Sequence, residues 1–242
     1  MNVDRIMPEW PAPPGVRAFS TTRAGGLSKG PWSGFNLGLH CGDKEQNVKK
    51  NRARLNRALP AAPQWLRQVH GTKVVRHPGL PADEAEGDAL VSFRPGEGCA
   101  VLTADCLPVI FCNRSGDRVG IAHAGWRGLA TGVLQATVNR LDEDPAELLA
   151  WLGPAIGPAA FEVGSDVADA FPEEFPAGFR SRGGRWLLDI YSMAKQKLAV
   201  AGVRSVFGGG FCTVTDSERF FSYRRDGVTG RMASLVWLEK SS

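Results

Sequence analysis

The sequence predicts an α+β fold in a single domain that covers residues 1–242. Segments with strand character and segments with helical spacing are interspersed along the chain, without the strict strand–helix–strand order of a doubly wound parallel sheet. We find no internal repeat and no convincing linker. Hydrophobic residues form 43% of the 242 residues, which supports a sizeable buried core.

Short apolar or alternating runs that end in turn residues predict the strands. They cover residues 16–22, 64–70, 73–77, 89–93, 99–104, 107–112, 118–122, 148–152 and 203–207. Cys99 and Cys112 lie inside apolar runs and are predicted to be inert core thiols.

Apolar residues at helical spacing predict the helices. They cover residues 47–59, which Pro60 ends, 129–141, 164–171 and 190–201. For the last helix, Asp189 is the predicted N-cap and Gly202 the residue just past its end. The long loop at 27–43 has a length that is usually functional, and residues 83–88 form an acidic loop.

Composition excludes several classes of protein. The net charge of +4 is mild and the basic residues form no patch with interleaved aromatics, so we expect no nucleic-acid partner. No apolar run approaches the roughly 20 residues needed to cross a bilayer, and the N-terminal segment lacks the apolar stretch of a signal peptide. The five cysteines are scattered without a disulfide framework, which favours a reduced, cytoplasmic setting.

Residues 103–128 (TADCLPVIFCNRSGDRVGIAHAGWRG) organise the predicted site. Turn residues at 113–117 join the two strands 107–112 and 118–122, so these strands should form a hairpin. Cys106 and His123 would then lie at the same end of the hairpin, where their side chains can meet. A thiolate beside an imidazole forms either a zinc site or a Cys–His nucleophile.

His70 is the third candidate ligand, at the end of a predicted strand and before a glycine. A single histidine is commonly structural, but His70, Cys106 and His123 together would leave a fourth zinc position open, as in catalytic sites. The chain lacks C-x-x-C, H-E-x-x-H, G-x-S-x-G, Walker A and zinc-deaminase motifs. Its four histidines include no H-x-H pair, which is a poor fit to a copper oxidase.

At these residues the sequence resembles the YfiH-type laccase-domain family. Three segments carry the resemblance: QVHG at 68–71, TADCLP at 103–108 and AHAGWRG at 122–128. Further matches lie at 36–40 (NLGLH), 51–52, 153–157 (GPAIG), 161–163 (FEV) and 220–226 (FFSYRRD). The resemblance covers about residues 15–238, which we take as the core of the domain.

The resemblance implies a four-layer α/β/β/α sandwich with mixed sheets, related to the catalytic domains of cytotoxic necrotizing factor toxins. It also implies a catalytic Zn²⁺ held by His70, Cys106 and His123. The implied reaction is phosphorolysis of adenosine, inosine, guanosine and methylthioadenosine to the base and ribose-1-phosphate, with adenosine deamination at the same site. The expected partners are purine nucleosides and inorganic phosphate, in a cytoplasmic monomer without nucleic-acid or membrane contacts.

Phosphorolysis needs a phosphate held near the metal. The backbone amides at 125–128, beginning with Gly125, start a predicted helix and can hold an anion, with Arg52 or Arg127 neutralising its charge. The resemblance adds Asn36 as a substrate contact and Glu162 as a proton carrier. We expect Asp105 to buttress its turn. A zinc position left open could also activate the water that deamination needs.

Three other functions stay open at this stage. One is a metal-free Cys106–His123 hydrolase or amidase, consistent with the editing of cell-wall precursors proposed for some relatives. Another is a copper-dependent polyphenol oxidase, as the older family name states. The third is a binding protein with a vestigial site. Metal analysis and an assay with adenosine, with and without phosphate, distinguish them.

Overall fold

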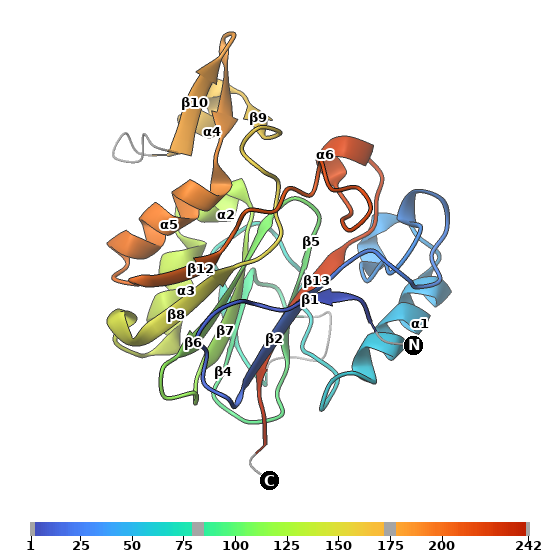
Figure 1. Ribbon diagram of the computed structural model, residues 1–242, viewed down its shortest axis with the longest axis vertical. Coiled ribbons are helices and arrows are strands. Elements are labelled where there is room, and N and C mark those ends of the chain that lie inside the picture. The colour runs from blue at the N-terminus through green and yellow to red at the C-terminus, as the bar shows by residue number, and fades with distance from the viewer. Residues whose placement is uncertain (1–2, 79–84, 172–177, 241–242) are drawn as a thin grey trace.

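Two β-sheets packed face to face form the centre of the computed structural model, which describes residues 3–78, 85–171 and 178–240 (Figure 1). The larger sheet has the strand order β12-β8-β6-β7-β4-β3. Its strands are β3 (Val74–Arg76), β4 (Ala89–Ser92), β6 (Leu107–Asn113), β7 (Val119–Ala124), β8 (Leu148–Leu152) and β12 (Ser205–Gly208). The two outer pairs are parallel and the central pairs antiparallel, so the sheet is mixed, as the resemblance implies.

The smaller central sheet is antiparallel and has the order β1-β2-β13-β5. Its strands are β1 (Arg5–Ile6), β2 (Val16–Thr21), β5 (Cys99–Thr103) and β13 (Met232–Leu238). Val101 of β5, Val236 of β13 and Ile110 of β6 belong to one fully buried cluster between the two sheets. This cluster explains why the strand runs of both sheets are almost entirely apolar.

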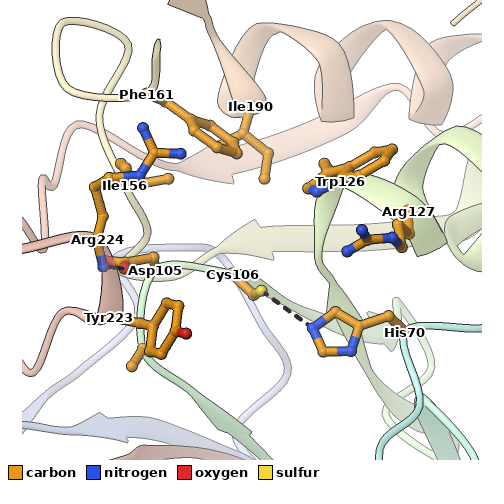
Figure 2. A pocket seen from close by; sticks show the side chains of 11 residues that line it. His70, Asp105, Cys106, Trp126, Arg127, Ile156, Phe161, Ile190, Tyr223 and Arg224 are labelled. Atoms are coloured by element: carbon orange, nitrogen blue, oxygen red, sulfur yellow. Dashed lines mark hydrogen bonds between the residues drawn. The ribbon is translucent and has the colours of Figure 1, made fainter. Parts of the chain in front are cut away.

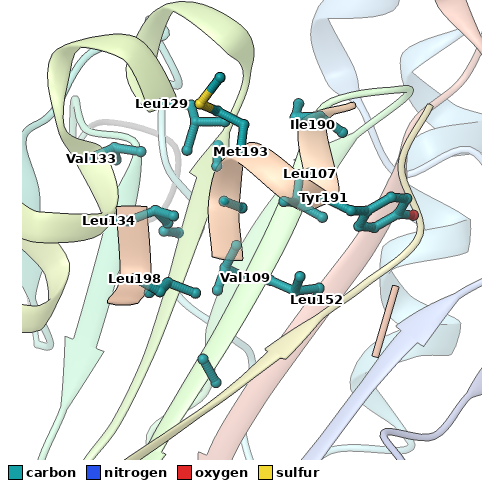
Figure 3. Close-up of a cluster of buried hydrophobic side chains, with 14 of the residues drawn as sticks. Leu107, Val109, Leu129, Val133, Leu134, Leu152, Ile190, Tyr191, Met193 and Leu198 are labelled. Atoms are coloured by element: carbon teal, nitrogen blue, oxygen red, sulfur yellow. The ribbon is translucent and has the colours of Figure 1, made fainter. Parts of the chain in front are cut away.

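Helices cover the outer face of each central sheet. The helix α1 (Glu45–Asn56) places Leu55 in a cluster with Phe19 and Leu235 of the smaller sheet. On the larger sheet lie α2 (Trp126–Thr131), α3 (Val133–Leu141) and α5 (Ile190–Val200). Leu134 of α3 and Leu198 of α5 point at the strands below them (Figure 3). The order helix, sheet, sheet, helix confirms the predicted four-layer sandwich.

A third, small sheet projects from the body beyond the end of α5 in Figure 1. It contains β9 (Glu162–Val163), β10 (Phe179–Arg182) and β11 (Arg185–Leu188), next to the short helix α4 (Ser165–Ala168). The sequence analysis predicted none of these strands. The remaining elements are a four-residue helix and three 3-10 turns: α6 (Tyr223–Asp226), η1 (Gly30–Trp32), η2 (Leu39–Cys41) and η3 (Pro145–Glu147).

The strand predicted at 64–70 is wrong. Only isolated bridges at Gln64 and Arg67 occur there, and His70 has a left-handed φ of 60°. The backbone N–H groups of Gln64 and Arg67 donate to the carbonyls of Gly98 and Ala85, and those of Val69 and His70 donate to the carboxylate of Asp88, so no continuous strand pairing forms. The amide of Gln68 accepts from the N–H of Leu102 at 2.8 Å and donates to its carbonyl at 2.9 Å, which covers part of the edge of β5.

Two other predictions need correction or fall partly outside the described chain. The predicted helix 129–141 is two helices, because Gly132 has a φ of 105° that only glycine adopts easily and ends α2 before α3 begins.

The predicted acidic loop 83–88 lies outside the described residues at 83–84. Among the described residues, no helix combines the length and apolar character needed to cross a membrane.

We expect Gly132→Ala to lower the free energy of unfolding by about 1–2 kcal/mol, the cost of a left-handed conformation for a residue with a Cβ atom. The nearest atom to that Cβ would be Oε1 of Gln135 at 3.6 Å, an ordinary contact, so the backbone angle is the cause. Urea unfolding measures the difference. Gly15→Ala is the control, since its Cβ would meet nothing within 4 Å. Equal free energies of unfolding for the two variants would show that the left-handed conformation at position 132 does not require glycine.

Candidate metal centre

The β6–β7 hairpin brings Cys106 and His123 together, as the sequence predicts. Pro108 pairs with His123 and Leu107 with Ala124, so Cys106 lies just beyond the last pair, across from Gly125. The apolar strands are fully buried and hold this end of the hairpin in place.

His70 reaches the same place from the loop before β3. The ligand atoms of His70, Cys106 and His123 all lie within 4.8 Å of one another. Sγ of Cys106 is 3.9 Å from Nε2 of His70, the contact drawn in Figure 2. His123 is buried, Cys106 partly buried and His70 exposed. The group is therefore anchored in the sheet and open to solvent on the side of His70.

The carboxylate of Asp88 holds both histidines. Its Oδ1 lies 2.8 Å from Nδ1 of His123 and accepts a hydrogen bond of 2.9 Å from the backbone N–H of His70. Its Oδ2 accepts from the N–H groups of Gly71 at 2.7 Å and Val69 at 3.2 Å. With Nδ1 of His123 engaged, Nε2 is the ring nitrogen left for a ligand role, an arrangement common behind metal-binding histidines.

Asp88 was not predicted as a site residue from the sequence, where it is the last residue of the acidic loop at 83–88. The residue is fully buried and directly precedes the apolar strand β4. The available signal was an aspartate directly before a buried strand. Such a residue is seldom buried without a charged or hydrogen-bonding partner, so its position indicates a partner nearby.

The charged forms of Cys106, His123 and Asp88 stabilise one another. Burial alone would raise the pKa of Cys106, but the charge and hydrogen bond of His123, with those of His70, lower it to about 6. Burial opposes protonation of His123, whereas the Cys106 thiolate and Asp88 raise its pKa to about 9. Burial also opposes ionisation of Asp88, but hydrogen bonds from His123 and from the loop amides lower its pKa. The protein therefore favours a thiolate at neutral pH.

Gly125 is required by the close packing of the ligands. A Cβ atom there would lie 2.9 Å from Cδ2 of His70 and 3.0 Å from Sγ of Cys106. The glycine, which precedes the first turn of α2, lets the helix approach the centre. Its predicted role as a phosphate contact is not tested by this packing.

Two cavities meet at the centre and share His70, Ala104, Cys106 and Tyr223. The first, which we call the aromatic cavity, has a volume of about 300 Å³. Its other lining residues are Trp126, Arg127, Ile156, Phe161, Ile190, Arg224 and Asp105 (Figure 2). The second, the polar cavity, has a volume of about 330 Å³. It is further lined by His40, Gln68, Leu102, Thr103, His123 and Arg231.

Of the predicted anion-binding arginines, Arg127 lies at the site and Arg52 does not line either cavity within the described chain. The guanidinium of Arg127 stacks 4.3 Å from the ring of Trp126. Nε of Arg52 donates to the carbonyl of Leu37 at 2.9 Å, and its guanidinium stacks 4.3 Å from the ring of Trp65. Arg52 thus supports the loop behind the polar cavity.

The other predicted residues are held by protein groups. Asn36 is fully buried, and Oε1 of Glu162 lies 3.2 Å from Nη1 of Arg185. The carboxylate of Asp105 accepts hydrogen bonds from the hydroxyl of Thr213 and from the backbone N–H of Arg224, which agrees with its predicted structural role. That anchoring matters, since Asp105 has a φ of 91°.

Several lining residues were not singled out in the sequence. His40, Tyr223 and Arg224 lie inside the segments 36–40 and 220–226 that carry the family resemblance, so those segments were the signal. Arg231 had none, because it lies outside the segments that carry the resemblance.

The donor set fits a metal ion. One thiolate and two imidazoles, with the second ring nitrogen of His123 bonded to a carboxylate, are donors that zinc and other soft or borderline metals prefer. Among the described residues, this is the one group of three or more His, Cys, Asp or Glu side chains close enough to hold a metal ion.

The fold and the site define an α/β/β/α sandwich protein with a His–Cys–His group able to hold a metal. A family model described as multi-copper polyphenol oxidoreductase laccase matches residues 17–239. The chain belongs to this family, that of the YfiH-type proteins.

Named relatives and solved structures agree with this assignment. The chain is 54% identical over 238 residues to the purine nucleoside phosphorylase YfiH of Escherichia coli, covering 96% of this chain and 98% of the relative. It is 52% identical over 239 residues to a purine nucleoside phosphorylase of Pseudomonas aeruginosa, with 97% and 98% covered. A crystal structure of a Neisseria meningitidis protein of the DUF152 family matches with a TM-score of 0.94 and 46% identity, over 98% of this chain and all of that one. YlmD from Geobacillus stearothermophilus matches with a TM-score of 0.88 and 34% identity, over 94% and 93%. The relation to cytotoxic necrotizing factors stays a prediction.

We expect Asp88→Asn to weaken zinc binding by about ten- to hundred-fold, the usual effect of losing a carboxylate behind a histidine ligand. An amide offers one acceptor oxygen to the four donors that Asp88 now serves, so His123 and the loop of His70 would lose their fixed positions. Competition with a zinc-binding dye measures the affinity. Glu86→Gln, which changes a partly exposed residue of the same loop that pairs with Arg67, should bind zinc like the unchanged protein. Unaltered affinity in Asp88→Asn would mean that the carboxylate does not position the ligands.

We expect Cys106 of chelator-treated protein to react with iodoacetamide with a midpoint near pH 6, because its lowered pKa keeps it a thiolate above that pH. Below the midpoint the thiol is protonated and the rate falls. Peptide mass spectrometry follows each cysteine separately. Cys112 is the internal control, since burial raises its pKa to about 12 and should leave it unmodified. A midpoint near 9.0, the ordinary value, would show that the histidines do not stabilise the thiolate.

Proposed function

We propose that this protein is a zinc-dependent purine nucleoside phosphorylase. It splits adenosine, inosine, guanosine and methylthioadenosine with phosphate into the base and ribose-1-phosphate, and it deaminates adenosine at the same site. The main support is the position of His70, Cys106 and His123 where an aromatic and a polar cavity meet. The names of the Escherichia coli and Pseudomonas aeruginosa relatives support the same reaction.

The chemistry of the ligands favours zinc, with His70, Cys106 and His123 as the residues that hold it. When bound, zinc would supply a Lewis acid with an open position that can polarise phosphate or water. Asp88 fixes the tautomer of His123, and the low pKa of Cys106 supplies a negative donor at neutral pH.

The aromatic cavity suits a purine. Trp126 and Phe161 offer flat apolar surfaces, and Tyr223 lies across the cavity from Trp126 (Figure 2). A volume of about 300 Å³ is at the lower end of the range for small-molecule sites. A base bound here would direct the ribose toward Cys106, where the second cavity begins, so that the bond to be broken lies beside the metal ligands.

The proposal includes a cytoplasmic, monomeric enzyme whose partners are purine nucleosides and inorganic phosphate. Nucleic acid and membranes have no part in it. The proton carrier for the departing base stays open between Glu162, which the sequence analysis names, and other groups.

One observation favours a second function, a metal-free thiol hydrolase. Asp88 contacts Nδ1 of His123, and His123 in turn stabilises the Cys106 thiolate, which is the order of groups in a cysteine nucleophile with a base and an orienting carboxylate. Such an enzyme would hydrolyse an amide or ester without metal.

Metal analysis together with an adenosine assay tests the proposal. We expect about one zinc per chain, formation of adenine only when phosphate is present, and formation of inosine without phosphate. Cys106→Ala should lose zinc and both products, because the thiolate is the only anionic ligand. Cys212→Ser changes a partly buried cysteine outside the ligand group and should keep all three.

Each alternative has its own signature in this experiment. Full adenosine activity after removal of the metal by chelation would refute the zinc mechanism. Hydrolysis of an amide or ester by the chelated protein, without turnover of adenosine, would establish the thiol hydrolase. Stoichiometric copper with reduction of oxygen to water would establish the oxidase of the family description. Stoichiometric zinc in Cys106→Ala would mean that the ligand set is wrong.

A further inference from the structure

The two cavities differ in the groups that they offer a ligand. Beside the shared residues, the aromatic cavity is lined by the side chains of Trp126, Phe161, Ile156 and Ile190 together with Asp105, Arg127 and Arg224. The polar cavity is lined instead by His40, Gln68, Thr103, His123 and Arg231, with Leu102 as its further apolar residue. A molecule in one cavity would meet a molecule in the other beside Cys106. A reaction between an aromatic heterocycle linked to a sugar and a small anion would therefore have separate places for its two reactants.

Arg231 is the arginine among the residues described as lining the polar cavity. Its Nη1 donates to the backbone carbonyls of Thr229 at 3.1 Å and Gly230 at 3.0 Å. Within residues 3–78, 85–171 and 178–240, its Nε and Nη2 have no hydrogen-bond partner, and no carboxylate forms an ion pair with it. A partly buried guanidinium without a counter-charge is a site for an external anion, because its planar donors match phosphate.

The backbone of Arg231 is held rigidly. Its N–H donates to Oδ1 of Asn36 at 2.8 Å, and its carbonyl accepts from the N–H of Leu37 at 3.1 Å. Its aliphatic stem packs on Gly38, where a Cβ atom would lie 2.8 Å from Cγ of Arg231. Asn36 therefore acts as a positioning residue for the arginine. A guanidinium fixed before its ligand arrives loses little entropy on binding.

The other arginines near the site face a different environment. Arg127 and Arg224 line the aromatic cavity, where Arg127 stacks on Trp126 and Arg224 lies 5.3 Å from the ring of Phe161. Nη1 of Arg224 also donates to the carbonyl of Glu162 at 2.7 Å. These two arginines extend the flat walls against which a purine would stack.

We infer that Arg231 binds the phosphate of phosphorolysis in the polar cavity, while the purine base occupies the aromatic cavity. The assignment rests on the proposed function and goes beyond it, since it moves the anion from the helix start at Gly125 and from Arg127, which lines the aromatic cavity, to Arg231 in the polar cavity. His40 borders the same cavity as a second polar contact.

Calorimetric titration of the zinc-loaded protein with inorganic phosphate tests the assignment. Arg231→Met keeps the aliphatic stem over Gly38 and removes the guanidinium. We expect it to weaken phosphate binding by about ten- to hundred-fold, as for the loss of a charge-assisted contact. The KM for adenosine should change less than about threefold, and the product ratio should move from adenine toward inosine. Arg127→Met, the matched control, should raise the KM for adenosine and leave phosphate binding unchanged.

The outcomes separate this inference from the proposed function. Phosphate affinity that is unchanged in Arg231→Met, lost in Arg127→Met, or absent from the unmodified protein would overturn the assignment. If phosphate binding depends on Arg231 but no phosphorolysis occurs, the anion site stands and the proposed function falls. Zinc content and thermal unfolding check that the variants are folded. If Arg231→Met does not fold, Arg231→Lys decides: it should bind phosphate about three- to ten-fold more weakly, and full affinity would contradict the inference.

Discussion

The carboxylate of Asp88 is the interaction on which the candidate metal centre depends. Its two oxygens serve four donors: the ring of His123 and the backbone amides of Val69, His70 and Gly71. His123 belongs to the larger sheet, whereas His70 lies in a loop with a left-handed backbone. One buried charge therefore sets the distance between two histidines that are remote in sequence. Its burial would be unfavourable without these four partners.

The two central sheets contribute to the site together. The larger sheet supplies His123 and the support for Cys106, while Leu102 and Thr103 of the smaller sheet line the polar cavity. The site lies where the ends of the central strands β6 and β7 of the larger sheet meet β5, the edge strand of the smaller sheet, so residues of both sheets line it. The tight packing of Gly125 against the ligands adds α2 as a third rigid boundary.

The parts of the site that could be predicted from the sequence follow from local patterns. Two apolar runs joined by a turn predicted the hairpin and the meeting of Cys106 with His123. His70 was a candidate from its position before a glycine, and the family motif at 68–71 then supported it. The strand predicted around it was wrong, because alternation also occurs in a segment that forms only isolated bridges to its neighbours. Asp88 and Arg231 were missed, since burial and missing counter-charges arise only when distant segments come together. The roles predicted for Arg52, Gly125 and Glu162 stay predictions.

Tyr223 forms part of the wall of both cavities, and 61% of it is exposed. A side chain this open can take several rotamers until a ligand packs against it. A reactant that packs against the ring would restrict it, so a second reactant would meet a boundary that is already ordered and would lose less entropy on binding. By thermodynamic linkage this help is mutual, and each reactant then raises the affinity for the other by the same factor. A shared aromatic wall would thus make the two binding equilibria cooperative without any movement of the backbone.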